Sequence, residues 1–358
     1  MKKKLAIILV IALAFTAFVG CGGGNDEGES ADLNVAVFYY NYSDVYISSV
    51  RTNLDAALDG LGVTYNNYDA AGNQASQTDQ ISTAITNGAN LLIVNIVETS
   101  SADAAQNAVE AAREAGIPII FFNREVADEV VNSYEQCAFV GTDAPEAGHM
   151  QGELIGNYLV ANYDAVDLNG DGVISYVMFK GQEGNAEAEA RTQYGVEDAN
   201  TVLVGAGFPE LSFYDANNAS KYLVDQNGTW SAAAATNYMD TILAEYTEAN
   251  GNMIELVIAN NDDMALGAIS SLQTAGYNVE GGTTIPVFGV DAVAAAQQAI
   301  DEGTMTGTIM QDAVGMADTI AALVTNVQGG AELMANTSSY NVDSGVAKIR
   351  VPYGVYTA

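Results

Sequence analysis

A short loop near the middle of the chain carries an oxygen-bearing group at every second position. Segment 167–175 reads DLNGDGVIS, and Gly172 stands where a loop that wraps an ion must turn sharply. The pattern matches the first nine positions of a calcium loop of the form D-x-[DN]-x-[DN]-G. Its oxygens belong to Asp167, Asn169, Asp171, Val173 (through the carbonyl) and Ser175. The usual twelfth-position Glu is missing, because Met178 stands there, so the predicted Ca²⁺ site needs a carboxylate from elsewhere; the alternative is a simple polar turn.

The elements that must position this loop follow a repeating strand–helix pattern. Short apolar runs predict strands over 35–39, 63–68, 91–94 and 117–122, and amphipathic stretches predict helices over 46–61, 74–86 and 102–115. Such an alternation predicts a parallel sheet with helices on both faces. Ligands of open parallel sheets bind beyond the carboxyl ends of the strands, so polar residues there deserve most weight.

The same pattern begins again after about residue 123. Strands are expected over 138–140, 174–179, 256–259 and 287–290, and helices over 144–162, 186–199, 232–249, 264–275 and 292–302. This is too much alternating structure for one sheet, so we predict two α/β lobes. The irregular stretch 205–228, rich in Asn, Ser, Phe and Tyr, is expected to be a surface insertion.

Composition narrows the possible partners. Of 358 residues, 45 are Asp or Glu and 11 are Lys or Arg, which gives a formal charge of −34. Nucleic acids and anionic membranes both require a basic face, so no nucleic-acid partner is expected. One His and two Cys exclude a site built on several histidines and a disulfide framework. His149 is interpreted as a surface or helix-packing residue.

The first thirty residues predict export. Three lysines precede an apolar run over 5–19, which is too short for a comfortable membrane span and leads to Cys21. This arrangement resembles a bacterial lipoprotein signal, so we expect a signal peptide over 1–20, lipidation of Cys21 and a flexible tether over 21–32. The alternative is an ordinary signal peptide. The mature protein is then extracytoplasmic and meets the membrane only through its lipid anchor.

Five parts of the chain carry a wider resemblance. They are 167–192 (DLNGDGVISYVMFKGQEGNAEAEART), 121–125 leading to 140–143 (FFNRE and VGTD), 255–262 (ELVIANND), 286–292 (PVFGVDA) and 350–353 (RVPY). They resemble the periplasmic galactose/glucose-binding proteins of sugar ABC transport, over about residues 33–353. The calcium loop and the segment after it are specific to this branch, whereas the FGVD motif is shared with other sugar-binding proteins and related repressors.

The resemblance implies a type I periplasmic binding protein fold, in which two doubly wound parallel-sheet lobes are joined by a hinge of several segments. The implied N-terminal lobe comprises 33–120 and 312–346, and the implied C-terminal lobe comprises 121–311 and 347–358. The family's missing calcium ligand is a Glu that opens the strand before Ala-Asn-Asn-Asp, and Glu255 stands at that position. The resemblance therefore implies a structural Ca²⁺ that pins a loop to a strand.

A monosaccharide site between the lobes is also implied. The residues at the matching positions are Asp44, Tyr46, Asn95, Asn185, Glu187, Arg191, Trp230, Asn261, Asp291 and Gln311. Tyr46 and Trp230 match rings that stack on the two faces of a pyranose, and the others match groups that bind its hydroxyls. Three positions depart from the family, which commonly has His, Asp and Asn where this chain has Asn185, Glu187 and Gln311. An added methylene is worth about 1–3 kcal/mol in a binding pocket, so these changes bear on which sugar is preferred.

Several of these residues have simpler interpretations from the sequence alone. Asp44 and Asp291 precede predicted helices and can cap them. Trp230 can be a core residue, and Arg191 can pair with Glu187 four residues earlier on one helix.

The favoured interpretation is a monomeric solute-binding lipoprotein that captures a galactose- or glucose-like monosaccharide and delivers it to an ABC permease. A sensor that presents the sugar to a chemoreceptor or kinase, or a receptor for xylose or a galactoside, is the alternative. An enzyme is not expected: the first strand lacks a following G-x-G-x-x-G, although composition leaves room for a pair of glycosidase carboxylates. The signal peptide and the acidic charge exclude a repressor.

Overall fold

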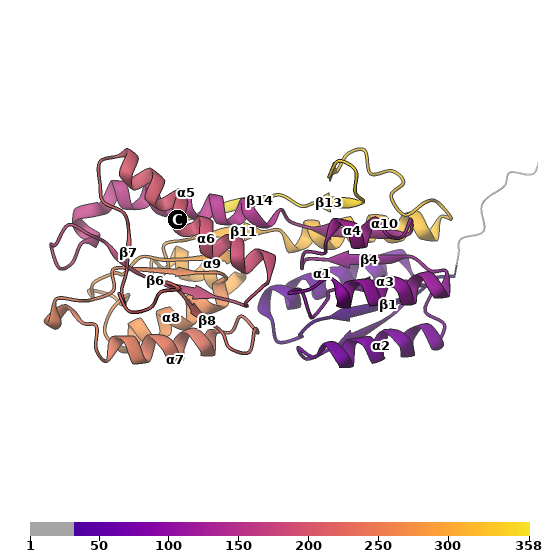
Figure 1. The fold of residues 1–358 in the computed structure, drawn as a ribbon, viewed down its shortest axis with the longest axis horizontal. Coiled ribbons are helices and arrows are strands. Elements are labelled where there is room, and N and C mark those ends of the chain that lie inside the picture. The colour runs from indigo at the N-terminus through magenta and orange to yellow at the C-terminus, as the bar shows by residue number, and fades with distance from the viewer. Residues whose placement is uncertain (1–31) are drawn as a thin grey trace, which may run out of the picture.

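Two α/β lobes lie end to end along the long axis of the molecule (Figure 1). The structure is a computed structural model that describes residues 32–358. The predicted signal peptide, Cys21 and the tether up to residue 31 lie outside the described residues. Within residues 32–358, no helix is long and apolar enough to cross a membrane.

The first lobe is built on a seven-stranded sheet. Its strands are β1 (Asn34–Tyr39), β2 (Thr64–Asp69), β3 (Leu91–Val94), β4 (Ile119–Phe122), β5 (Cys137–Gly141), β12 (Asn341–Val342) and β13 (Lys348–Arg350). They lie in the order β12-β13-β5-β4-β3-β1-β2, and every pair is parallel except β12 with β13. The helices are α1 (Val45–Leu61), α2 (Gln74–Thr86), α3 (Asp103–Ala115), α4 (Asp128–Val131) and α10 (Ala313–Gln328).

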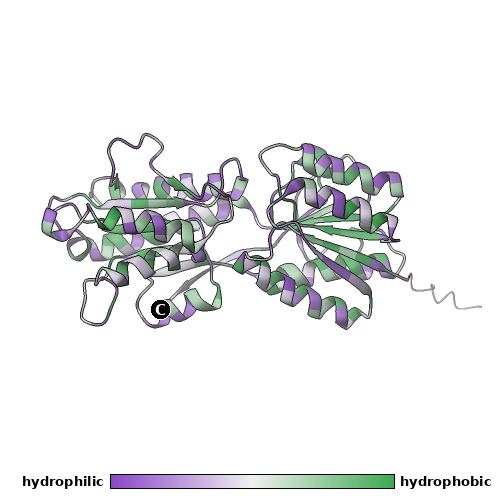
Figure 2. Ribbon diagram, turned by 90° about the horizontal axis from the view of Figure 1, so that it is seen from below, coloured by the Kyte–Doolittle hydropathy of each residue, from purple (hydrophilic) through white to green (hydrophobic). Residues whose placement is uncertain are grey.

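Helices bury both faces of this sheet. Along β1, Val35 and Val37 face the core under α1 and α10, whereas Ala36 and Phe38 face the core under α2 and α3. This is the two-residue period of a strand whose two faces are both covered, and it explains why β1 reads as a continuous apolar run. Figure 2 shows the same arrangement, with apolar strands inside and polar helix faces outside.

The second lobe repeats the design. Its strands are β6 (Ser175–Lys180), β7 (Ser212–Phe213), β8 (Leu223–Val224), β9 (Leu256–Ala259), β10 (Val287–Asp291), β11 (Gly307–Gln311) and β14 (Tyr353–Thr357). The sheet order is β14-β11-β10-β9-β6-β7, and β8 also pairs with β6. Helices α5 (Ala144–Val166) and α6 (Ala186–Gly205) cover one face; α7 (Ala232–Leu243), α8 (Asp262–Thr274) and α9 (Ala294–Asp301) cover the other, and η1 (Glu248–Asn250) is a short 3₁₀ turn. The prediction of a surface insertion over 205–228 is wrong in part, because this stretch supplies β7 and β8.

Three short connections join the lobes. They run from β5 to α5 through residues 142–143, from β11 to α10 through Asp312, and from β13 to β14 through residues 351–352. Two predicted boundaries, 120/121 and 346/347, are therefore wrong: β4, β5 and β13 all belong to the first sheet. The reason is strand pairing, since β4 lies between β3 and β5, and β13 pairs with β5 in turn.

Helices α5 and α6 approach each other backbone to backbone. Gly148, Gly152 and Gly156 repeat every four residues along α5 and face α6. A Cβ atom on Gly152 would lie 2.4 Å from the carbonyl oxygen of Tyr194. This close approach matters for function because the first turns of α6 reach the space between the lobes.

We expect Gly152→Ala to lower the free energy of unfolding by about 1–3 kcal/mol, because the extra methyl group overpacks the α5–α6 contact. The matched control is Gly60→Ala in α1, where an added Cβ meets nothing within 4 Å. That change should be neutral or stabilise by about 0.4–1 kcal/mol. Urea denaturation of both variants is the measurement, and equal stabilities would contradict the prediction.

Candidate functional site

A cleft lies where the carboxyl ends of the strands of the two lobes face each other, with about 380 Å³ of empty space that includes its opening to solvent. Its walls are formed by Tyr40, Asp44, Tyr46, Asn123, Arg124, Asn185, Glu187, Arg191, Trp230, Asn261, Asp291 and Gln311. Nine of the ten residues predicted for the site line this cleft, and Asn95 does not. Both lobes contribute, so the site is complete only when they are close together.

Arg191 lies at the base of the cleft, in the second turn of α6. Its guanidinium is buried and donates to the carbonyl oxygen of Asn260 (2.9 Å), to Oε1 of Gln311 (3.1 Å) and to the hydroxyl of Tyr353 (3.0 Å). Burial opposes the charged form, but Tyr353 and Asp291 stabilise it, so the pKa of Arg191 remains above its usual value. Its Nε is buried without a protein partner and is free to donate to a ligand.

Trp230 forms an aromatic wall of the cleft, and several features hold it there. Its backbone has a φ of 58°, an uncommon conformation for a large residue, and its ring lies so close to Gly181 that any Cβ there would overlap it. Asp225 ties the loop together by accepting hydrogen bonds from Thr229 and Ser231. The amide of Asn261 donates to the Trp230 carbonyl oxygen (3.2 Å).

Three acidic side chains line the same cleft. Burial raises the pKa of Asp44, Glu187 and Asp291, and Asp291 is shifted furthest above its usual value. Asp44 accepts from the Tyr40 hydroxyl (2.5 Å) and from the Ile47 N–H at the start of α1 (2.8 Å), so it is both a helix cap and a wall of the cleft. Asp291 sits at the end of β10 with a φ of 125°.

Contacts across the mouth hold the lobes together. Arg124 donates to Oε1 of Gln182. The Glu125 N–H donates to Oε1 of Glu187 (3.0 Å), and the amide of Asn185 reaches the Thr99 hydroxyl (3.5 Å). These contacts bring the walls from the two lobes together at the mouth, while the cleft stays partly open to solvent.

Asn95 has a structural position instead of the predicted place in the cleft. It is fully buried, accepts from the Tyr40 N–H (3.2 Å) and donates to the Phe122 carbonyl oxygen (3.1 Å). It thus ties the ends of β1 and β4 together behind the cleft wall. Its amide also donates to Oδ1 of Asn123 (3.2 Å), so Asn95 supports a residue of the cleft wall without lining the cleft itself.

Tyr40, Asn123 and Arg124 line the cleft and were missed from the sequence. The guanidinium of Arg124 lies 4.2 Å from the centre of the Tyr40 ring, and its Nε is buried without a protein partner. All three residues follow directly on β1 or β4. The rule that ligands bind beyond the carboxyl ends of parallel strands could have found them.

The predicted calcium loop is brought together with Glu255. The Glu255 carboxylate is buried at the start of β9 and accepts from the N–H groups of Leu168 (2.8 Å) and Ser175 (2.8 Å). Asp167 and Asp171 accept from N–H groups within the loop. The oxygen-only donor set suits Ca²⁺. In residues 32–358, however, no three acidic, His or Cys side chains converge as metal ligands, because the carboxylates are turned to backbone N–H groups.

Comparison with known proteins identifies the family. The model for the periplasmic binding protein domain matches residues 35–332, which is most of the chain. The chain belongs to this family. Periplasmic binding proteins are solute-binding components of transport systems, not enzymes, and act outside the cytoplasm.

Individual relatives agree with this assignment. The chain is 32% identical over 354 residues to the D-galactose/methyl-galactoside binding periplasmic protein MglB of Haemophilus influenzae, covering 98% of this chain and 96% of the relative. An ABC transporter solute-binding protein from Clostridium phytofermentans with bound β-D-glucose matches with a TM-score of 0.69, 22% identity, and 91% and 94% coverage. A Bacillus halodurans solute-binding protein with bound myo-inositol matches with a TM-score of 0.67, 22% identity, and 92% and 96% coverage. These two structures confirm the predicted two-lobe fold.

The buried carboxyl of Asp262, next to Asn261 in the cleft wall, predicts a pH dependence of stability. Burial raises its pKa to about 7, against hydrogen bonds from the Thr308 hydroxyl (2.6 Å) and the Val293 N–H (2.9 Å). The folded state holds this proton more tightly than the unfolded chain, whose Asp has a pKa of about 4. The stabilisation is therefore complete below pH of about 4 and is lost as the pH rises through about 7.

We expect the free energy of unfolding of the wild type, minus that of Asp262→Asn, to fall as the pH rises from about 4 to about 7. Urea denaturation of both proteins at each pH is the measurement. Asp164→Asn, the same change at an exposed position, controls for the loss of one charge. A difference between wild type and Asp262→Asn that is the same at every pH would show that the Asp262 pKa is not raised.

Proposed function

We propose that this protein is an extracytoplasmic receptor that binds a galactose- or glucose-like monosaccharide in the interlobe cleft and delivers it to an ABC permease. The observation that carries the proposal is a set of buried polar atoms without protein partners. Among the described residues these include three donors and one acceptor in the cleft: Nε of Arg124, Nε of Arg191, Nε2 of Gln311 and Oε2 of Glu187.

The chemistry of these groups suits a polyol. A buried polar atom without a partner costs about 1–3 kcal/mol, so each one favours a ligand that satisfies it. A hydroxyl group both donates and accepts, and so matches a wall of mixed donors and acceptors. The rings of Trp230 and Tyr46 add apolar surface for the C–H faces of a sugar. The 32% identical relative named for galactose and methyl-galactoside supports the same ligand class.

The three departures from the family pattern bear on the choice of sugar. Oδ1 of Asn185 caps α6, and one oxygen of Glu187 accepts from Glu125. Oε1 of Gln311 accepts from Arg191, which leaves its Nε2 for the ligand. A receptor for another sugar, such as xylose or a galactoside, would retain the same fold and the same wall, so a panel of sugars is needed.

We expect calorimetric titration with D-galactose, D-glucose, D-xylose and methyl β-D-galactoside to show tight binding of at least one hexose. Trp230→Ala and Asp291→Ala should each weaken that binding by about 1–3 kcal/mol, because each removes a buried stacking or polar contact. Asp164→Ala, the same change at an exposed position, should leave affinity unchanged. Wild-type affinity in both cleft variants would contradict the proposed site.

Attachment and partners form a second part of the proposal. We propose that Cys21 carries a lipid that holds the receptor at the membrane, as the sequence around it suggests. The receptor then works as a monomer with an ABC permease, and the same sugar-bound form is suited to a chemoreceptor or kinase. Both roles depend on a closed, sugar-bound state that differs from the open one.

We also propose that the loop 167–175 binds Ca²⁺ together with Glu255. The proposal rests on the spacing of its oxygens and on the contact of Glu255 with the loop backbone. The loop carboxylates would hold the ion, which supplies positive charge that locks the loop to β9.

If the loop binds Ca²⁺, saturating Ca²⁺ should stabilise the protein by about 2.7 kcal/mol at a hundred times the dissociation constant, because the ion binds the folded state alone. Thermal melting in Ca²⁺ and in EDTA is the measurement. Asp171→Ala, which removes both side-chain oxygens at an exposed loop position, should abolish most of this gain. Identical melting curves of the wild type in Ca²⁺ and EDTA would rule the site out.

A further inference from the structure

A single guanidinium in the cleft is connected to all three segments that join the lobes. Arg191 donates directly to Gln311, the last residue of β11 before the second connection, and to Tyr353, the first residue after the third. The hydroxyl of Tyr353 in turn contacts the hydroxyl of Thr142 in the first connection at 2.7 Å. Arg191, Tyr353 and Thr142 thus form a chain from the cleft to the hinge.

The direction of one of these hydrogen bonds follows from the groups involved. Arg191 can only donate, so the Tyr353 oxygen accepts from it. Between the hydroxyls of Tyr353 and Thr142, either one can be the donor. Thr142 is fully buried and Tyr353 is nearly so, which shields both contacts from bulk solvent.

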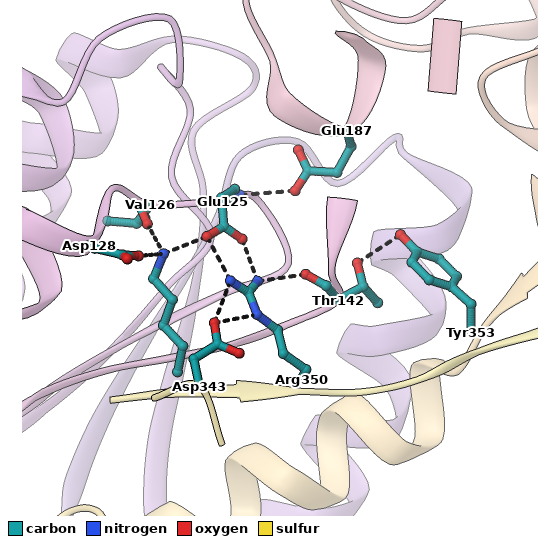
Figure 3. A network of polar contacts seen from close by, with 9 residues as sticks. Glu125, Val126, Asp128, Thr142, Glu187, Asp343, Arg350 and Tyr353 are labelled. Carbon is teal, nitrogen blue, oxygen red and sulfur yellow. Dashed lines mark hydrogen bonds and ion pairs between the residues drawn. The ribbon is translucent and has the colours of Figure 1, made fainter. Parts of the chain in front are cut away.

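A second branch leads from the hinge to Glu187, one turn before Arg191 on α6 (Figure 3). The carbonyl oxygen of Thr142 accepts from Arg350 (2.7 Å). Arg350 binds both carboxylate oxygens of Glu125 (2.6 and 3.1 Å). The Glu125 N–H then donates across the cleft to Glu187 (3.0 Å).

The two branches form a closed ring of contacts through both lobes. Going round it, Arg191 leads to Tyr353, Thr142, Arg350, Glu125 and Glu187, and α6 returns to Arg191. The ring is reinforced by Lys348, which is buried and bound to Glu125 (2.5 Å) and Asp128 (2.6 Å), and by Asp343, which binds Arg350 (2.8 Å). The two cleft residues with unpartnered atoms on α6 are therefore fixed in place from the hinge.

We propose that Tyr353 and Thr142 are positioning residues that couple the sugar to lobe closure by holding Arg191 against the hinge. A sugar that accepts a hydrogen bond from Nε of Arg191 then binds the closed conformation, in which the three connections are arranged as seen here, more tightly than the open one. This inference rests on the proposed sugar-binding function, and it assigns roles to two residues that do not themselves line the cleft.

Tyr353→Phe tests the coupling because it removes only the hydroxyl. The matched control is Tyr356→Phe on the same strand, whose hydroxyl contacts Asp301 on the surface (3.2 Å). We expect Tyr353→Phe to weaken D-galactose or D-glucose binding about tenfold, as expected for a lost hydrogen bond to a charged group, mainly through faster dissociation. Tyr356→Phe should bind as the wild type does.

A double-mutant cycle separates coupling from general destabilisation. If the hydroxyls act as one chain, Thr142→Val should weaken binding when introduced alone but add little to Tyr353→Phe. Thr142→Ser keeps the hydroxyl and should restore wild-type affinity. Melting temperatures of all variants show whether each is folded.

Either wild-type affinity in Tyr353→Phe or additive effects of the two substitutions would overturn the coupling while leaving the receptor function intact. If the wild type binds none of the sugars in the panel, the proposed function fails and the coupling fails with it. The receptor function and the coupling are both supported if the wild type binds a sugar, Tyr353→Phe loses about tenfold in affinity, and Tyr356→Phe loses none.

Discussion

The structure depends on how a buried guanidinium is accommodated between two lobes. Arg191 is almost completely removed from water, so its donors require acceptors that the protein supplies at fixed positions. Those acceptors come from β11, β14 and the end of β9, so they also define how the C-terminal lobe meets the hinge. Of its three nitrogens, Nε alone has no protein partner. A cleft that leaves a nitrogen of a buried cation without an acceptor is organised to receive something that accepts a hydrogen bond.

The backbone of the cleft also contains residues in uncommon conformations. Asn123, Trp230 and Asp291 all have positive φ angles, although none is a glycine. Such conformations cost of order 1–3 kcal/mol each and persist only where the surrounding structure enforces them. Here Asn123 follows β4, Asp291 ends β10 and Trp230 lies shortly before α7, so regular elements anchor the backbone next to each of them. The binding residues are thus preorganised by elements whose own stability comes from the two buried cores.

Much of this could be predicted from the sequence, and the failures have physical causes. Strands such as β1 and β9 are short apolar runs between helical patterns, and the structure has them where the pattern predicts. β11 and β14 contain Gly, Thr and Gln or alternate in exposure, so their apolar signal is weak and neither was predicted. The predicted lobe boundaries were wrong for a related reason. The apolar sequence of a buried strand such as β4 does not indicate which of the two sheets the strand joins.

At the site, a position just beyond the end of a strand was a reliable predictor of residues near the cleft. The direction in which each side chain points could not be predicted from the sequence. Asn95 follows β3 as expected but turns inward to join β1 and β4, which only the packing decides. Arg124 and Tyr40 satisfied the same positional rule and do line the cleft. The hinge contacts of Arg191 join residues up to 162 positions apart, and no local pattern records such a pairing.

The most direct test of this account is a crystal structure of the protein with the sugar that it binds. The account predicts one sugar ring in the interlobe cleft, with an oxygen accepting from Nε of Arg191 and the contacts of Arg191 to Gln311 and Tyr353 intact. A sugar bound elsewhere, or an Arg191 turned away from the hinge in the complex, would contradict it.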